Sequence, residues 1–395
     1  MPATAASGRR APQQSAPQPL IPFTAAAHHH VEPAFTTQTV TPGAAAVNIG
    51  PLDVSAFGYL RHIVLEVVGA GGTIGAGVLP PDYPFNLFQS ITLFDVNGAP
   101  IFGPLGGYQT LWANIVGGYV WSQDPRRNPQ YVSTINATFV MRIPVEILAH
   151  NALGCLGNQN AAAAYKVQLA INPSAAVYTT APTTPATFTI KGWLEAWTLP
   201  APADMAGRPQ AQIPPAHGTT QYWSVFKRQV LNGNNTLLFP RVGNLIRAII
   251  CITRNTTAQG SGDNQRDSTV FPTNPQLVWD ARMLFNEDQL YRLTKDYEVI
   301  ENLNALDAGV FFYPFNFGGD GTQGRAGDEQ PNLWLPTVQA SRLELDGTVA
   351  SGTGGSIEVV TNDIAPVEVV PQERYVETSA SGFHPEVGVS GPAVQ

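Results

Sequence analysis

The sequence predicts an all-β protein made of two similar β domains, each with one short helix inserted after a hairpin. The first observation is composition: 13% of the 395 residues are charged, and there are 37 glycines and 34 prolines. Low charge with many turn-forming residues is typical of short strands joined by many loops. The second observation is that many segments alternate between apolar and polar residues. The third is that the order of elements in the first half recurs in the second. The length is sufficient for two separate cores.

One stretch, residues 84–119, organises the first half. Residues 88–94 (FQSITLF) alternate as a strand, and Asn97-Gly98 favours the positive φ angles of a type I′ turn between antiparallel strands. Residues 99–102 would return as a short strand, and 108–116 place their apolar residues on one side of a helix. The predicted unit is therefore strand, tight turn, strand and helix.

Other strands of the first half are predicted at 59–68, 138–147, 165–171 and 187–198, with Pro144 marking an edge or a bulge. The glycine-rich stretch 69–77 (GAGGTIGAG) superficially resembles a dinucleotide-binding turn. We reject that interpretation because Leu79-Pro80-Pro81 follows it, so that no helix N-terminus is available for a pyrophosphate.

The second half repeats this order at low sequence identity. The apolar strand 245–253 opens with Ile246-Arg247, as its counterpart at 59–65 opens with Leu60-Arg61. A strand at 277–285 would correspond to 87–94, and it is again followed by a helix, at 287–297. Further strands are predicted at 311–317 (with Pro314 in the place of Pro144), 341–345 and 356–361. We interpret the pattern as an internal duplication.

Changes in composition predict five segments. Residues 1–40 are rich in Ala, Pro, Gln and Thr and form an N-terminal arm, either a disordered tail or an arm that orders only against a neighbour. The first β domain is expected at 41–200 and the second at 218–372. The proline-rich residues 201–217 would be a linker, and 373–395 a C-terminal tail.

Charge and cysteine content restrict the function further. The net charge of −8 argues against a dedicated nucleic-acid binder, which would carry a basic stripe. Cys251 lies in a strongly apolar strand and is expected to be a buried thiol, so the two cysteines, at 155 and 251, do not indicate a redox compartment. No apolar run is long enough to span a membrane, and we expect no signal peptide.

No residue set indicates catalysis, because HExxH, GxSxG and Walker sequences are all absent. We predict no catalytic, cofactor-binding or metal-binding residue, no cofactor, and a protein that is not an enzyme. Each group that was considered has a simpler explanation: His28-His29-His30 as a solvated tract, Asp320, Asp328 and Glu329 as a solvated loop rather than a calcium site, and Asp280 with Glu287-Asp288 as solvated or capping groups.

Two tryptophans carry a further alternative. Trp193 and Trp197 are four residues apart, so in a strand they face the same side. They could form a platform for a sugar, but they are expected to be core or interface aromatics.

The order of elements resembles the double jelly-roll major capsid proteins of tailless icosahedral viruses with an internal membrane, and tectivirus-like bacteriophage coat proteins in particular. The resemblance covers roughly 41–372. It rests on five stretches: FGYLRHIVLEVV, FNLFQSITLFDVNGAPI with the helix after it, GWLEAWTLP, LVWDARMLFNEDQLYRL and LWLPTVQASRLELDG.

This resemblance implies two tandem eight-stranded jelly rolls, in a major capsid protein that trimerises into pseudo-hexagonal capsomers. The capsomers would assemble the virion shell around an internal membrane and a double-stranded DNA genome, from chains made in the host cytoplasm. The partners would be further copies of the chain, minor capsid proteins, and the viral membrane through the N-terminal arm, without sequence-specific nucleic-acid binding. Two alternatives remain open: a carbohydrate-binding or carbohydrate-active β-sandwich protein, and a minor capsid or vertex protein.

Overall fold

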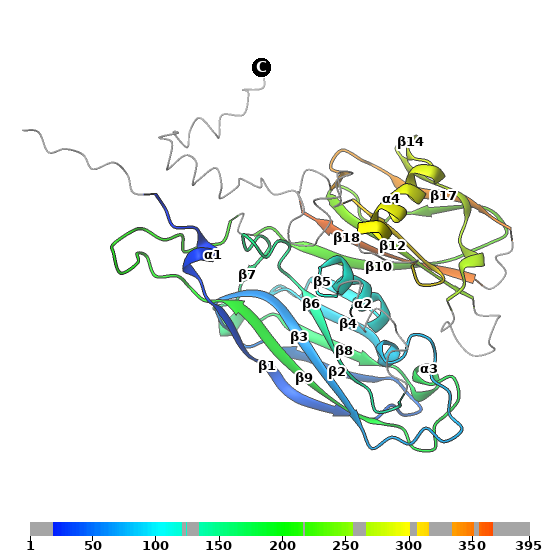
Figure 1. The fold of residues 1–395 in the computed structure, drawn as a ribbon, viewed down its shortest axis with the longest axis horizontal. Helices are drawn as coiled ribbons and strands as arrows, with labels where there is room; N and C mark the ends of the chain where they lie inside the picture. Colours follow the sequence, from blue (N-terminus) through cyan, green and yellow to red (C-terminus); the bar gives the residue numbers. More distant parts are fainter. Residues whose placement is uncertain are drawn as a thin grey trace, which may run out of the picture.

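The computed structural model describes residues 19–120, 124, 134–215, 218–255, 266–300, 306–315, 334–350 and 355–365. They form two packed β-sandwiches arranged one after the other along the chain (Figure 1). Side chains alternate between buried and more exposed positions along strands such as β9, so that sheet has one face in a core, whereas β12 and β18 are buried on both faces. None of the described helices is long and apolar enough to cross a membrane.

The first roll contains two four-stranded sheets. One has the order β1-β9-β3-β6 and the other the order β2-β8-β4-β5, while the short β7 pairs with β3. The bounds of these strands are β1 His29–Val40, β2 Val47–Asp53, β3 Tyr59–Ala70, β4 Phe88–Phe94, β5 Pro100–Leu105, β6 Thr138–Pro144, β7 Leu156–Gly157, β8 Lys166–Ile171 and β9 Thr187–Trp197. The helices are α1 Phe23–Ala26, α2 Gly107–Val116 and α3 Ser174–Val177, with 3-10 turns at Phe85–Leu87 and Ala161–Ala163.

The second roll repeats this plan. Its sheets have the orders β15-β12-β18-β10 and β11-β17-β13-β14, and the short β16 pairs with β12. The bounds are β10 Gln221–Gln229, β11 Gly233–Leu238, β12 Leu245–Asn255, β13 Thr273–Trp279, β14 Arg282–Phe285, α4 Glu287–Ile300, β15 Val310–Pro314, β16 Leu335–Pro336, β17 Leu343–Val349 and β18 Gly355–Ile364, with a 3-10 turn at Ser268–Val270. β10 also pairs in parallel with β5 at Trp223 and Phe102, which joins a sheet of each roll.

The duplication extends to local irregularities. In the pairing of β3 with β9 the register shifts between Leu60 and His62, and in that of β12 with β18 it shifts between Ile246 and Ala248. Each shift falls at the arginine of the pairs Leu60-Arg61 and Ile246-Arg247. This arginine is the extra residue of a β-bulge. The prediction of two tandem eight-stranded jelly rolls with an inserted helix in each is confirmed.

The predicted arm at residues 1–40 is wrong for its last part. Residues 29–40 form β1, which pairs with β9 throughout its length. Before it, Phe23 of α1 is fully buried in a small cluster with Tyr59 and Cys155. The strand was missed because β1 is an edge strand with two register shifts, so its sequence lacks a regular alternation. Residues 1–18 and the predicted tail at 373–395 lie outside the described residues.

The predicted single strand at 277–285 is also wrong, because it is a hairpin. Trp279 pairs with Arg282, and the two residues between them have positive φ, 45° for Asp280 and 65° for Ala281. This is the geometry of a type I′ turn. Asp280 stabilises it by accepting hydrogen bonds from the Ser341 backbone and hydroxyl. The second half therefore has the same strand, turn, strand and helix unit as the first.

The turn at Asn97-Gly98 differs from the predicted type I′ turn. Only Gly98 has a positive φ, of 85°. The Gly98 amide donates to the Asp95 carbonyl at 3.1 Å, and the Asp95 amide donates to the Ala99 carbonyl at 2.8 Å. The loop therefore has three residues, a tight turn followed by one left-handed residue. The Asp95 carboxylate, which accepts from the Asn97 and Ala99 amides, favours this longer loop.

Gly98→Val is expected to lower the free energy of unfolding by about 1–2 kcal/mol, because a β-branched residue is strained at positive φ. No atom lies within 4 Å of a Cβ built there, so backbone strain is the only contribution. Asn97→Val is the matched control and should change stability by less than about 0.5 kcal/mol. Urea unfolding measures both, and equal losses would contradict this turn assignment.

Ala281→Gly is expected to raise the free energy of unfolding by about 1 kcal/mol. A non-glycine residue at a φ of 65° carries strain that glycine relieves. The melting temperature checks this effect, and a lower value would show that the turn is not held in this geometry.

Candidate assembly interface

Helix α2 lies where the two rolls meet (Figure 1). All ten of its residues are buried, including the polar Gln109, Thr110 and Asn114, so the helix is enclosed on all sides. The Trp112 ring lies 5.8 Å from the ring of Phe312 on β15. Trp112 belongs to one core cluster with Ile250, Ile252 and Val360 of the second roll. The two rolls therefore share a continuous core through α2.

A buried network of charges lies beside this helix. Asp82, in the loop before β4, is 2% exposed and binds one arginine on each carboxylate oxygen. Arg254 Nη1 donates to Asp82 Oδ2 at 2.8 Å, and Arg266 Nε donates to Asp82 Oδ1 at 2.9 Å. Arg254 Nε also donates to Glu358 Oε2 at 3.1 Å. Burial disfavours the charged form of Arg254. The nearby carboxylates of Glu358 and Asp82 outweigh this effect, so the pKa of Arg254 is raised.

Side chains of α2 complete the network. Gln109 Nε2 donates to Glu358 Oε2 at 2.9 Å, and the Tyr108 hydroxyl donates to Asp307 Oδ2 at 2.7 Å. Burial raises the pKa of Tyr108 well above its ordinary value, which keeps the phenol neutral and able to donate. Because the network has members from both rolls and each carboxylate has a partner, it favours one relative orientation of the rolls.

The outer face of the sheet β1-β9-β3-β6 carries a second polar group. We call it the outer sheet face and define it by His62, Glu66, Arg142, Lys191, Trp193 and Glu195. His62 Nε2 lies 2.6 Å from Glu195 Oε2, and His29 Nε2 lies 3.1 Å from the same oxygen. The Arg142 guanidinium is 4.0 Å from the other oxygen of Glu195. Burial lowers the pKa of His62, so its imidazole is neutral at pH 7 and donates to the carboxylate.

The free energy of unfolding should fall as the pH is lowered below about 6.5, the ordinary pKa of histidine. In that range the unfolded chain binds a proton at His62 more readily than the native chain, whose His62 pKa is lowered by burial, so stability rises with pH. The charges and rings that face this imidazole are Glu195, Arg142, Arg61 and Tyr119. His62→Gln keeps a donor for Glu195 and should flatten the slope by up to about 1.4 kcal/mol per pH unit. An unchanged slope in urea titrations between pH 5 and 7 would contradict this.

Trp193 and Trp197 do face the same side of β9, where partly buried and fully buried residues alternate. Their indole nitrogens donate to Glu66 at 3.0 Å and to Glu146 at 2.8 Å. The Arg61 guanidinium lies 4.4 Å above the Trp197 ring, and the ring of Phe23 packs edge-on against it. A sugar therefore could not stack on the face of Trp197 that Arg61 covers.

The other residues singled out in the sequence are dispersed. His28 is exposed, His29 pairs with Glu195, and His30 stacks on Phe57 at 4.1 Å. Within the described ranges no three His, Cys, Asp or Glu side chains are grouped so as to hold a metal ion. Asp320, Asp328 and Glu329 fall outside those ranges. Cys155 and Cys251 are free and buried, as predicted for Cys251.

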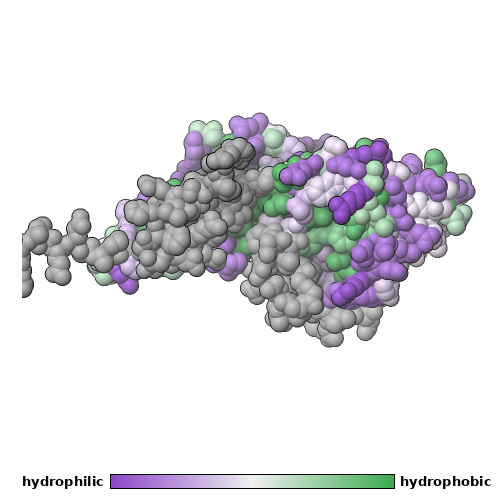
Figure 2. All heavy atoms as spheres, turned by 90° about the horizontal axis from the view of Figure 1, so that it is seen from above, coloured by the Kyte–Doolittle hydropathy of each residue, from purple (hydrophilic) through white to green (hydrophobic). Residues whose placement is uncertain are grey.

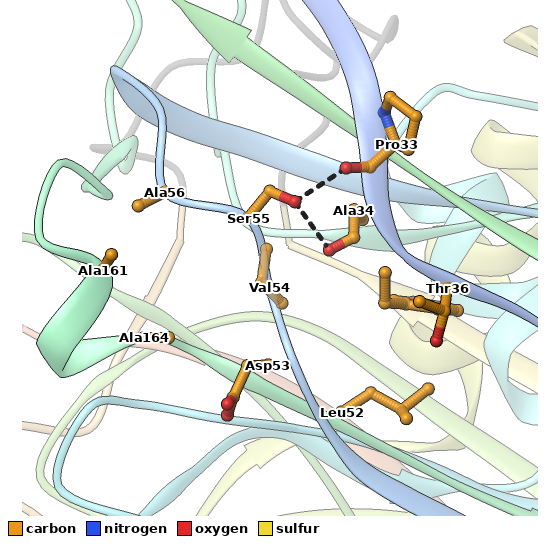
Figure 3. A pocket seen from close by; sticks show the side chains of 11 residues that line it. Pro33, Ala34, Thr36, Leu52, Asp53, Val54, Ser55, Ala56, Ala161 and Ala164 are labelled. Carbon is orange, nitrogen blue, oxygen red and sulfur yellow. Dashed lines mark hydrogen bonds between the residues drawn. The ribbon is translucent and has the colours of Figure 1, made fainter.

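An open groove of about 520 Å³ lies between β1 and the segment that follows β2 (Figure 3). Its walls are mostly small residues, and the Ser55 hydroxyl donates across it to the Pro33 carbonyl at 2.8 Å. Asp53 is the only titratable side chain among its lining residues. The groove therefore lacks a pair of groups for acid–base catalysis.

The sequence reasoning missed the charge network entirely. Its members lie far apart along the chain: Asp82 and Arg254 are separated by 172 positions, and Gln109 and Glu358 by 249. The sequence gives only a weak signal for this network. Arg254 lies near the end of a mostly apolar strand, and Glu358 interrupts another. A charge in a fully buried strand requires a partner, which the sequence does not identify.

No family model matches this sequence, and no curated protein matches it. Solved structures do match. The major capsid protein of Sulfolobus Turreted Icosahedral Virus aligns with a TM-score of 0.56 and 12% identity, over 86% of this chain and 97% of that one. A second structure from that virus gives a TM-score of 0.55 and 13% identity, over 90% and 99%.

The capsid of the virus PBCV-1 aligns with a TM-score of 0.53 and 13% identity, over 86% of this chain and 94% of the other. At these identities the alignments establish the fold. Each alignment covers at least 86% of this chain and at least 94% of the matched chain, so it includes both rolls. The protein therefore has the double jelly-roll fold that is found in viral major capsid proteins.

Proposed function

We propose that this protein is a viral major capsid protein and that three copies form a capsomer of pseudo-hexagonal outline. The observation that carries the proposal is the rigid union of two complete jelly rolls. Helix α2 is enclosed between them and the buried charge network ties them together. Two stiff rolls held at one angle make a wedge-shaped subunit, and three such subunits present six rolls around a ring.

The wider role follows from the same proposal. The capsomers would form an icosahedral shell around an internal membrane and a double-stranded DNA genome, after synthesis in the host cytoplasm. Residues 1–18 are the part of the predicted arm that precedes the described residues, and they would contact the membrane or minor capsid proteins on the inside of the shell. The narrower expectation of a tectivirus-like bacteriophage coat stays a prediction.

Light scattering behind a sizing column tests the proposal directly. A stable particle of three chains, about three times 42.2 kDa, is the expected result. A strict monomer at micromolar concentration would overturn the capsomer. A deletion of residues 1–18 tests the arm: it should leave the trimer intact but prevent closed shells from forming. The deletion stops short of Phe23, because removing 1–40 would also remove β1.

A further inference from the structure

The helices α2 and α4 occupy equivalent places on their rolls. At the start of each helix a glutamine side chain accepts from a backbone amide at 2.9 Å: Gln109 from Gly106, and Gln289 from Asn286. One turn further on, Asn114 donates to the Arg142 carbonyl at 2.7 Å, and Thr294 donates to the Phe312 carbonyl at 2.9 Å. A shift of 180 positions therefore relates α2 to α4.

The sheets can be matched residue by residue from the shared bulge. After the bulge, Val64 pairs with Trp193 in the first roll, and Ile250 pairs with Val360 in the second. Two residues later, Glu66 pairs with Lys191, and Ile252 pairs with Glu358. By the same count Arg142, which faces Val64, corresponds to Phe312, which faces Ile250. Trp193 and Lys191 thus hold the places of Val360 and Glu358.

Among the residues that the structure describes, only one of the two equivalent contacts is made. Helix α2 covers the outer face of the second roll's sheet, where Gln109 reaches Glu358 and Trp112 reaches Phe312. The matching face of α4 is open: Tyr291 is 62% exposed and the Arg292 side chain 78%. The view in Figure 2 looks onto the side of the second roll where α4 and β14 lie in Figure 1, and hydrophilic residues predominate there. The Lys191 side chain, on the outer sheet face, is 41% exposed.

We infer that α4 of one copy packs on the outer sheet face of the next copy, with Gln289 against Lys191 and Tyr291 beside Trp193. The inference rests on the proposed function and specifies which surfaces meet in the capsomer. The contact is heterologous, since it joins two different patches, and such contacts generate closed rings when the rotation permits. A second copy is the occupant because the chain already makes the equivalent contact within itself, between α2 and the second roll.

The charge on the sheet is reversed between the two sites, Glu358 in one and Lys191 in the other, and a glutamine side chain can bind either charge. Gln109 donates its amide N–H to the carboxylate of Glu358. At the equivalent site the sheet carries the cation Lys191, and an amide can accept through its carbonyl oxygen as well as donate. Arg292 would lie near Arg142, and each brings a carboxylate, Asp296 at 3.6 Å and Glu195 at 4.0 Å. The exposed face of α4 is polar because it faces water before assembly, whereas the matching face of α2 is buried within the chain.

Cross-linking tests the contact. The double variant Gln289→Cys/Lys191→Cys, treated with a short bismaleimide, should give covalent dimers and trimers on denaturing gels. The native thiols at Cys155 and Cys251 are 1% and 0% exposed, so they contribute little background. Either single variant should remain monomeric on the gel. The control variant Met205→Cys/Lys191→Cys should also remain monomeric on the gel, because position 205 is fully exposed and lies outside the proposed contact.

A pair of substitutions at one position provides the second test. Gln289→Glu places an opposite charge against Lys191 and should tighten the trimer, whereas Gln289→Lys places a like charge there and should raise its dissociation constant about tenfold. Glu keeps an acceptor for the Asn286 amide and Lys removes it, so an effect on the helix alone could also separate the two variants. Combining each variant with Lys191→Glu removes this ambiguity: the order should reverse, with Gln289→Lys then forming the tighter trimer. Raised salt should weaken assembly of the wild-type chain and diminish the difference between the variants.

The outcomes separate the two proposals. Trimers that cross-link through positions 191 and 289 support both. Trimers seen by light scattering that give no cross-linked ladder, or that respond identically to the two substitutions, overturn this contact and leave the capsid proposal intact. A chain that stays monomeric under all conditions overturns both.

Discussion

Trp112→Ala is expected to lower the free energy of unfolding by about 3–5 kcal/mol, the usual cost of removing a large aromatic side chain from a core. Trp112 is 2% exposed and packs against Phe312 of the other roll. The cavity would lie where the two rolls share their core, so we expect the rolls to lose their cooperative unfolding as well. Calorimetry should then show two transitions in place of one.

The matched control is Arg292→Ala, at the equivalent position of α4. Its side chain is 78% exposed, so this change should cost less than about 0.5 kcal/mol in the dissociated chain. If the two substitutions destabilised the chain equally, the enclosed position of α2 would be wrong.

Arg254→Met is expected to cost about 3–5 kcal/mol, since it leaves the carboxylates of Asp82 and Glu358 short of a partner in a buried site. Methionine preserves much of the volume of the side chain, so the loss reports charge rather than packing. The loss should be measurable as a lower urea midpoint at an unchanged m-value.

A double substitution isolates the electrostatic contribution. Arg254→Met combined with Asp82→Asn should be less destabilising than the sum of the two single changes, because the second removes a charge that the first leaves unpaired. Strict additivity would mean that Asp82 and Arg254 do not interact as the 2.8 Å contact implies.

Several elements could be predicted from local pattern. The strand at Tyr59–Ala70 and the helix at Gly107–Val116 were recognisable because their apolar residues recur with the period of their secondary structure. The hairpin of β13 and β14 was not, because its turn uses Asp280-Ala281 without glycine. What holds that turn is a set of hydrogen bonds from Ser341 to Asp280, sixty-one positions away.

Order and periodicity along the chain were therefore sufficient for the all-β class, the duplication and the helix inserted in each half. These depend on interactions between near neighbours, which the sequence displays directly. The assignment of β1 to the first roll, the burial of α2 but not α4, and the charge network required the folded chain. Each arises from contacts between distant residues, such as Gln109 with Glu358. Helices α2 and α4 hold equivalent places on their rolls but differ in polarity. Among the described residues, only α2 has the other roll of its own chain packed against it.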